Sequence, residues 1–438
     1  MKTKTFIIAA IVATTLFASC AKEKTSELGE GNPTFMGLSF TFPAGSTPTK
    51  ASSDDNANAA ETAFVSVDVF IYNSSTGTQT THKRLLPSDF TGETPGTNAD
   101  VWTMKAEAKI ATTTGPKTVI VGVNLPSSLS SSLVGVAFPY VAQTIAVANI
   151  TGSTDGFAMF STEPVQINLI KDPDFGAKQN YPTVQVQRMV AKVTVQKDEY
   201  MSIVGSGYLT DLRFELNNTN KKTFYIQPAD KKDHNWATTP GAGDDALNGL
   251  NSTYIPVDEY NVSVKSLAPK YCLENTTRDF LMSQITRATV RGTFVPNEVK
   301  EYENGTDKNN GYVDMPIASG TTPVTFYSVT YNAGTARAYF FDPLVAADFA
   351  ADHGGTTVLE YANGYCYWDI YLNPDNAAGP YNVLRNDFYR CNIIKIMAPG
   401  RPTPEVADPT LPPTASTDIM VDIEMLHWNP IVKNYILD

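Results

Sequence analysis

The stretch Val65-Ser66-Val67-Asp68-Val69-Phe70-Ile71 places a β-branched apolar residue at every second position. Residues 184–187 and 211–216 repeat this two-residue period. Because successive side chains of a strand point to opposite faces, the period predicts strands with one buried face. Runs rich in β-branched and aromatic residues, at 119–123 and 324–329, are separated by Gly, Pro, Asn and Asp clusters typical of turns. The predicted fold class is therefore all-β, with β-sandwich domains and few short helices.

The chain is long enough for more than one domain, since 438 residues exceed the usual size of a single hydrophobic core. A strand-like stretch at 184–195 is followed by a fresh series of strands from Tyr208 onward. We therefore expect an N-terminal domain at 51–185 and a C-terminal domain at 186–400. Short helices are expected near 127–147 and 344–352.

The charge of the chain argues against two kinds of partner. The net charge is −12, whereas a nucleic-acid-binding surface needs clustered Lys and Arg to neutralise phosphates. The same acidity argues against an anionic membrane surface as the main partner.

Signals of catalysis and of metal binding are weak. The sequence has no GxSxG, HExxH or P-loop motif. It has no CxxC motif, and its four His residues stand apart, so a structural zinc site is not expected. Acidic loops at 172–174, 244–245 and 307–311 lack the ligand spacing of a calcium loop and are interpreted as solvated turns. We expect no catalytic residue, no metal and no cofactor.

The first residues predict export. Lys2 and Lys4 precede an apolar run at 6–18 that is too short for a stable membrane span. The run ends at Ser19-Cys20, where a small residue precedes a cysteine that can take a diacylglycerol. We interpret residues 1–19 as a lipoprotein signal peptide and Cys20 as the lipidated residue, which gives a transient membrane anchor. The alternative is an ordinary signal peptide followed by a chance cysteine.

Two polar stretches are interpreted as linkers outside the core. Residues 43–62 lack large apolar side chains and cannot offset the entropy cost of ordering. Residues 399–413 contain six prolines and predict a stiff, extended spacer.

A strand with one apolar face lies beyond each linker, at 36–42 and at 419–425. The apolar faces consist of Met36, Leu38, Phe40 and Phe42 in the first strand, and of Ile419, Val421, Ile423 and Met425 in the second. These could be the first and last strands of one sandwich. However, the spacer is long for a return to the same sheet, so the second strand is predicted to be available to another molecule.

Lys50 is the only Lys or Arg between Lys24 and Lys83, and its Gly/Pro/Ser/Thr-rich surroundings favour proteolysis. A cut between Lys50 and Ala51 would release residues 20–50, with the lipid and the first strand. The alternative is an ordinary solvated lysine.

Loss of the first strand would expose the groove that it fills. Four apolar side chains at roughly 1.5–3 kcal/mol each would lose about 6–12 kcal/mol of burial. The exposed groove would need a replacement strand, and residues 419–425 of another copy are chemically similar. Such a contact is head to tail and gives a filament.

With these features the chain resembles the Bacteroidia-type fimbrillins, also called type V pilins. Beyond Cys20 and Lys50, the resemblance is carried by Gln187-Arg188-Met189-Val190-Ala191-Lys192-Val193, Tyr367-Trp368-Asp369-Ile370-Tyr371-Leu372-Asn373, Val383-Leu384-Arg385-Asn386-Asp387-Phe388-Tyr389 and the terminal stretch from Ile419 to Trp428. The spacing of the Trp-x-x-Tyr-x-Asn and Arg-Asn-x-x-Tyr motifs is fairly specific.

The resemblance implies two transthyretin-like β-sandwich domains and the role of a stalk subunit in an adhesive fimbria. It implies a lipidated precursor at the outer membrane, a maturation protease that cuts at the basic residue, and polymerisation with other copies and related pilins at the cell surface. Members often carry Arg at the cut, whereas this chain has Lys50, which leaves the protease specificity open.

One alternative is a surface glycan-binding lipoprotein or a tip adhesin that keeps its lipid. Tyr367, Trp368 and Tyr371 would then form a platform on which a sugar stacks, although strand aromatics are more often part of the core.

Overall fold

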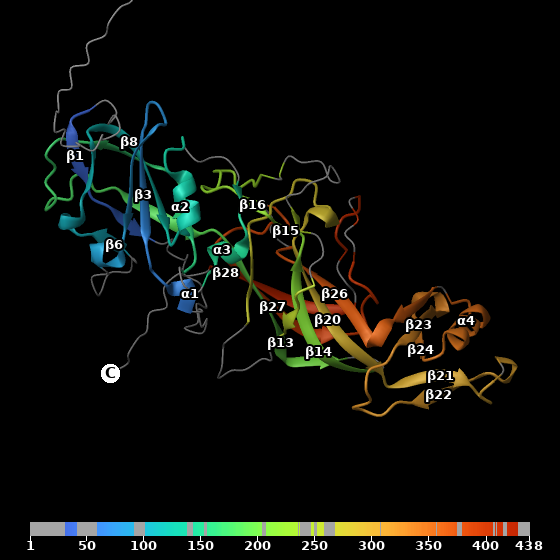
Figure 1. Cartoon of the computed structure of the whole chain (residues 1–438). Coiled ribbons are helices and arrows are strands. Elements are labelled where there is room, and N and C mark those ends of the chain that lie inside the picture. Colours follow the sequence, from blue (N-terminus) through green and yellow to red (C-terminus); the bar gives the residue numbers. More distant parts are fainter. Residues whose placement is uncertain are drawn as a thin grey trace, which may run out of the picture.

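The computed structural model shows an elongated, all-β molecule, which confirms the predicted fold class (Figure 1). An N-terminal domain lies at one end, a C-terminal sandwich in the middle, and a small lobe at the other end. The structure describes residues 31–41, 59–91, 101–137, 143–152, 156–203, 207–234, 236, 247–248, 252–257, 268–306, 308–355, 357–374, 379–405, 408, 410–414 and 418–427.

The N-terminal domain is built on a nine-stranded sheet in the order β4-β3-β8-β10-β12-β2-β6-β5, with β11 also paired to β8. Its strands are β2 (Ser39–Thr41), β3 (Val67–Asn73), β4 (Gln79–Leu85), β5 (Phe90–Thr91), β6 (Val101–Met104), β8 (Gly115–Val123), β10 (Met159–Ser161), β11 (Val165–Leu169) and β12 (Thr183–Arg188). A separate pair joins β1 (Pro33–Met36) to β7 (Ile110–Thr113). The alternating residues Val67, Val69 and Ile71 of β3 all point into the core of this domain, as their period predicts.

The C-terminal domain is a sandwich of two four-stranded sheets around one core. One sheet has the order β19 (Lys270–Cys272), β13 (Ala191–Ile203), β27 (Asp387–Ile396), β28 (Ile419–His427). The other has the order β18 (Ile255–Pro256), β14 (Gly207–Asn217), β20 (Arg287–Pro296), β26 (Tyr365–Tyr371). Trp368 is fully buried between them and donates its indole N–H to the Ala398 carbonyl at 3.2 Å.

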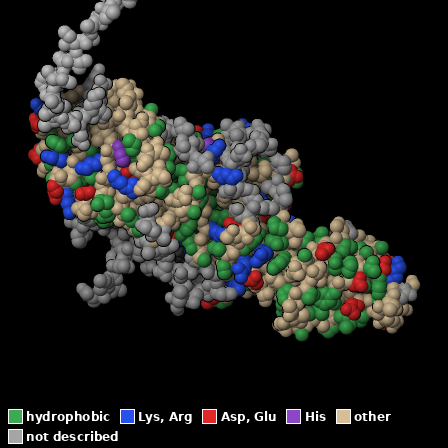
Figure 2. Space-filling model, in the orientation of Figure 1, with side chains coloured by type: hydrophobic (Ala, Val, Ile, Leu, Met, Phe, Trp, Pro, Cys, Tyr) green, Lys and Arg blue, Asp and Glu red, His purple; other side chains and the backbone are tan. Residues whose placement is uncertain are grey.

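The lobe is an insertion between the neighbouring strands β20 and β26, and the sequence analysis did not foresee it. It contains β21 (Glu298–Tyr302), β22 (Tyr312–Pro316), β23 (Phe326–Tyr331), β24 (Ala336–Phe340), α4 (Pro343–Asp352) and β25 (Val358–Tyr361). Phe349 of α4 packs on Phe340 in a small separate core. Figure 2 shows many hydrophobic side chains on the visible face of the lobe.

The two domains share a third core, to which Phe70 and Phe160 contribute from one side and Tyr225 and Phe388 from the other. Two-stranded pairings flank it: β9 (Gln143–Thr144) pairs with β16 (Lys222–Thr223), and β15 (Thr219–Asn220) pairs with β17 (Leu247–Asn248). The chain leaves the N-terminal sheet after β12 and enters the C-terminal sheet at β13, so only Met189 and Val190 separate the two.

A buried ionic cluster closes this junction and corrects one prediction. The polar stretch 43–62 was expected to stay outside the core, yet its last residues form α1 (Ala59–Thr62), in which Glu61 is fully buried. The Glu61 carboxylate accepts from Lys192 Nζ at 3.1 Å and from the Tyr271 hydroxyl at 2.5 Å. The buried Arg188 guanidinium donates to the Glu61 backbone carbonyl at 2.8 Å. Charged partners across the junction hold this segment, together with Ala60, which is buried in the core that the two domains share.

The remaining helices are short: α2 (Ser127–Leu133) and α3 (Val147–Ile150). Together with α4 they confirm helices in both regions where short ones were expected. Among the described residues, no helix has the length and apolar character that a membrane span requires.

Candidate site for strand exchange

Within the segment that contains β1 and β2, β2 lies in the middle of the nine-stranded sheet, and β1 pairs with β7. β2 is parallel to β12 on one side and antiparallel to β6 on the other, with Phe40 opposite Val184 and Trp102. Both edges of β2 are therefore paired. The single strand expected at 36–42 is in fact two short strands separated by Gly37 and Leu38, and the first begins at Pro33.

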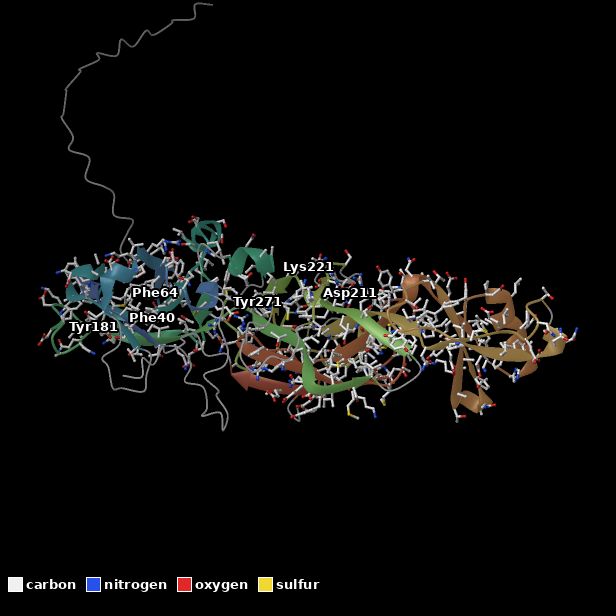
Figure 3. All side chains as sticks on the ribbon, turned by 90° about the horizontal axis from the view of Figure 1, so that it is seen from below. Phe40, Phe64, Tyr181, Asp211, Lys221 and Tyr271 are labelled. Atoms are coloured by element: carbon white, nitrogen blue, oxygen red, sulfur yellow. The ribbon has the colours of Figure 1, made fainter. Side chains whose placement is uncertain are left out.

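The apolar face of this segment is buried as predicted. Met36, Leu38 and Phe40 each have 0% of their surface exposed and belong to the core of the domain. The Phe40 ring makes edge-to-face contacts with Phe64 at 5.7 Å and with Phe90 at 5.4 Å between centroids. Figure 3 shows Phe40 and Phe64 close together in this domain. The segment thus supplies three fully buried side chains to the core that surrounds it.

Asn180 fastens the first half of the segment through its side chain and its backbone. Its amide group donates to the Phe35 carbonyl at 2.9 Å and to the Ile170 carbonyl at 3.0 Å. Its backbone carbonyl accepts from Gly37 N–H at 3.0 Å. Asn180 has a φ of 55°, a left-handed conformation that Asn tolerates better than most residues.

Tyr181, which sequence reasoning missed, lies across the segment at Gly37. A Cβ built on Gly37 would be 2.1 Å from Tyr181 Cζ, so only a glycine fits beneath the ring. The Tyr181 hydroxyl donates to the Met104 carbonyl at 3.3 Å, on the side of β2 away from residue 181. Burial, and secondarily the Glu107 carboxylate, raise the pKa of Tyr181, so the hydroxyl keeps its proton at neutral pH. No local pattern signals this contact, because residues 37 and 181 are far apart in sequence.

The strand expected to be donated, β28, lies at the edge of the chain's own C-terminal sheet. It pairs antiparallel with β27 from Asp387↔His427 to Ile396↔Ile419. Within the described part of the chain, β27 is the only strand that pairs with it. This is the intramolecular arrangement that the sequence analysis gave as the alternative, and donation to a neighbour stays a prediction.

The predicted apolar face of β28 is only partly buried. Ile419 is 8% exposed, and Val421 and Ile423 pack, partly buried, on the core of the sandwich. Met425 is 52% exposed. On the opposite face Glu424 pairs with Arg390 at 3.2 Å.

The proline-rich spacer does not stand free of the domain, which corrects a second prediction. Gly400 packs against β26, where a Cβ would be 2.1 Å from the Tyr367 carbonyl oxygen. Arg401 exchanges backbone hydrogen bonds with Tyr367 and pairs with the buried Asp369 at 2.6 Å. Further on, the Leu411 carbonyl accepts from Met282 N–H at 2.9 Å. Specific polar contacts, which composition does not reveal, hold the spacer on the sandwich.

Other predicted residues lie outside the described part of the chain. They are the signal peptide 1–19, the lipidation residue Cys20, Phe42 of the first strand, the cleavage residues Lys50 and Ala51, and Trp428.

The aromatic residues considered for a sugar platform are mostly core. Trp368 is 0% and Tyr371 7% exposed, so these two cannot stack on a ligand at the surface. The described cysteines Cys272, Cys366 and Cys391 are buried and free. Within the described ranges, no three His, Cys, Asp or Glu side chains are grouped as a metal site requires.

The Arg-Asn-x-x-Tyr motif has a structural role at the domain junction. Arg385 is buried and donates from Nε to the Glu274 carboxylate at 2.7 Å. Asn386 has a φ of 62° and donates its backbone N–H to the Val190 carbonyl at 2.9 Å. Tyr389 accepts from Leu384 N–H through its hydroxyl at 3.1 Å. The motif therefore fixes the turn that enters β27 against the link between the two domains.

Comparison with known proteins gives a match to one family model in the C-terminal part of the chain. The model for "Major fimbrial subunit protein type IV, Fimbrillin, C-terminal" matches residues 359–434, which include β26, β27 and β28. The resemblance to the Bacteroidia-type fimbrillins is confirmed. No match was found among curated proteins.

Solved structures show the same fold over most of the chain. A fimbrilin from Porphyromonas gingivalis W83 is 13% identical with a TM-score of 0.50, covering 90% of this chain and 98% of its own. A proposed cell adhesion protein from Parabacteroides distasonis ATCC 8503 is also 13% identical with a TM-score of 0.50, over 91% of this chain and 98% of its own. At this identity the similarity establishes the fold alone.

Proposed function

We propose that this chain is a structural subunit of an adhesive cell-surface fimbria and that it polymerises by strand exchange. One observation carries the proposal: in the segment 33–41, β2 fills the middle of its sheet between β12 and β6, β1 pairs with β7, and three side chains are fully buried. Its removal would open an apolar groove between two strands whose edges would be left unpaired. An open groove of this kind is a template for strand addition.

The position of β28 supports its role as the replacement. Among the described strands β28 pairs with β27 alone, so it can leave its sheet without separating the other strands, although Ile419, Val421 and Ile423 would lose their contacts with the core. Met425 is already 52% exposed. The groove belongs to the N-terminal domain and β28 to the C-terminal domain. The contact between copies would therefore be heterologous, and its repetition gives a filament.

The proposed maturation begins with export of a precursor that is lipidated at Cys20 and delivered to the outer membrane. A protease then cuts between Lys50 and Ala51. This position supports the proposal because it lies after β2, which ends at Thr41, and before α1, which begins at Ala59. The cut would free the segment 33–41 while α1 stays held through Glu61.

Limited trypsin digestion of the full chain tests the proposal. We expect a new N-terminus at Ala51 and a ladder of SDS-resistant polymers on unboiled gels. A chain that ends at Thr414, and so lacks β28, should be cut equally and stay monomeric. Monomers from both chains after the cut would contradict the proposal. Acylated Cys20 on mature surface protein would favour the lipoprotein alternative.

A further inference from the structure

The space above Gly37 admits no side chain while the Tyr181 ring is in place. A Cβ at this position would lie 2.1 Å from Tyr181 Cζ and 2.3 Å from both Cε atoms. Gly37 is not among the glycines with a positive φ, so its backbone conformation does not require glycine. The requirement for glycine comes from the Tyr181 ring that lies above this position.

The Tyr181 side chain crosses over the segment from its β12 side to its β6 side. On one side of the segment, the Asn180 and Pro182 carbonyls accept from Gly37 and Ser39 N–H, each at 3.0 Å. On the other side, Met104 N–H donates to the Leu38 carbonyl at 2.8 Å and its own carbonyl accepts the Tyr181 hydroxyl. Figure 3 shows Tyr181 beside Phe40 at the outer end of the N-terminal domain.

The strand proposed to replace this segment has no glycine. When its apolar residues are superposed on those of the segment in the same direction, Ile419 takes the place of Met36 and Met420 the place of Gly37. In registers displaced by two or four residues, Asp422 or Glu424 takes this place instead. Each of these side chains would overlap the Tyr181 ring.

We propose that Tyr181 is the residue that selects which strand can occupy this groove. Its ring accepts the chain's own segment, which has glycine at the crossing point, and excludes residues 419–427 of a neighbour until the ring rotates away. The inference rests on the proposed strand exchange and adds a step to it. The ring can move, because Tyr181 is only half-buried and is held by one long hydrogen bond and an edge-to-face contact with Phe175 at 5.3 Å.

The experiment uses the full chain after trypsin has cut it at Lys50, and a fluorescent peptide with the sequence of residues 418–427. The measured quantity is the rate of peptide capture, together with release of the fragment that ends at Lys50. Tyr181→Ala should capture the natural peptide about tenfold faster or more, because the overlap is removed. Tyr200→Ala is the matched control, since Tyr200 is 79% exposed and remote from the groove, and its rate should equal that of the wild type.

Modified peptides separate selection by the ring from a general loosening of the domain. Three peptides carry Met420→Gly, Asp422→Gly or Glu424→Gly. The wild type should capture one of them about tenfold faster than the natural peptide, and Tyr181→Ala should capture that peptide and the natural one equally fast. Equal acceleration of all peptides by Tyr181→Ala would overturn the role of Tyr181. Capture of no peptide by either protein would overturn strand exchange itself.

A substitution in the segment gives a second test in the uncut chain. Gly37→Ala should lower the denaturation midpoint of the N-terminal domain, because the added methyl group overlaps the ring. The same substitution in Tyr181→Ala should cost much less. Equal losses in the two backgrounds would show that the ring does not set the requirement for glycine.

Discussion

Phe40 shows how much one side chain of the removable segment contributes to the precursor. Its ring is fully buried against Phe64 and Phe90. We expect Phe40→Ala to lower the free energy of unfolding of the uncut chain by about 3–5 kcal/mol, the usual cost of removing a buried aromatic ring. Urea unfolding measures this loss. Phe35→Ala is the control: Phe35 is 39% exposed, and its ring lies under Lys109 Nζ at 4.1 Å. Equal losses would contradict the inward orientation of the segment.

The stability of the folded chain is predicted to depend on pH through Asp418, which lies immediately before β28. Burial raises its pKa, against the opposing effect of Arg337 and Arg401. The folded state therefore binds the proton more tightly, and this group's contribution to stability falls as the pH rises above the unfolded value of about 4. Asp418→Asn should be more stable than the wild type at pH 7, by less than about 1 kcal/mol. The difference should shrink as the pH approaches 4, and a difference that grows toward acid pH would contradict the assignment.

Contacts between residues that are far apart in the sequence were the least predictable part of the site. The alternation of Met36, Leu38 and Phe40 was enough to predict which side chains are buried, because a strand has a fixed period. Tyr181 over Gly37 and Glu61 beside Lys192 depend on which distant segments meet. A single acidic residue in a polar stretch carries no sign that it will be buried.

Among the elements, β28 is the one whose role separates the proposal from its alternative. It serves only the chain's own sandwich, or it can be donated to a neighbour. Ile423 packs partly buried on the sandwich core, whereas Glu424 faces outward. Ile423→Asp should abolish the polymer ladder of the trypsin-treated chain, because a charge would enter an apolar groove. The subunit should stay folded, since β28 lies at an edge.

Circular dichroism measures whether the variant is folded, and unboiled gels measure whether it polymerises. Glu424→Gln is the control and should polymerise like the wild type. Unfolding of Ile423→Asp would show that β28 serves mainly the chain's own sandwich.

The sequence predicted where the strands lie better than it predicted which strands pair with one another. The strand periods at 65–71 and 211–216 correspond to β3 and β14, because one buried face imposes the alternation. The place of β28 could not be predicted, because an edge strand and a donated strand have the same pattern. The lobe was missed because an insertion between two neighbouring strands leaves the strand pattern on both sides unchanged.

At the scale of the whole molecule, one cut is predicted to convert a stable monomer into a polymerising subunit. Lys50→Ala should resist trypsin at this position and keep the segment 33–41 in its groove. The variant should stay monomeric on unboiled gels, whereas Lys24→Ala, which removes a lysine upstream of the segment, should polymerise after trypsin treatment. Wild-type amounts of polymer from Lys50→Ala would show that the switch lies elsewhere.

The central claim is that β28 of one copy occupies the place of β2 in another, and a cross-link between two differently marked chains tests it most directly. Ser39 of β2 lies opposite Thr103, with 3.3 Å between the hydroxyl oxygens. In the superposed register Asp422 of the donor takes the place of Ser39. A Thr103→Cys chain mixed with an Asp422→Cys chain, cut after Lys50 and oxidised, should give a disulfide-linked heterodimer, and the uncut mixture should not. In registers displaced by two or four residues, Glu424 or Leu426 takes the place of Ser39, so Glu424→Cys and Leu426→Cys chains are tested in the same way. Polymer that forms without a cross-link from any of the three donor positions, or a cross-link that needs no cut, would contradict the account.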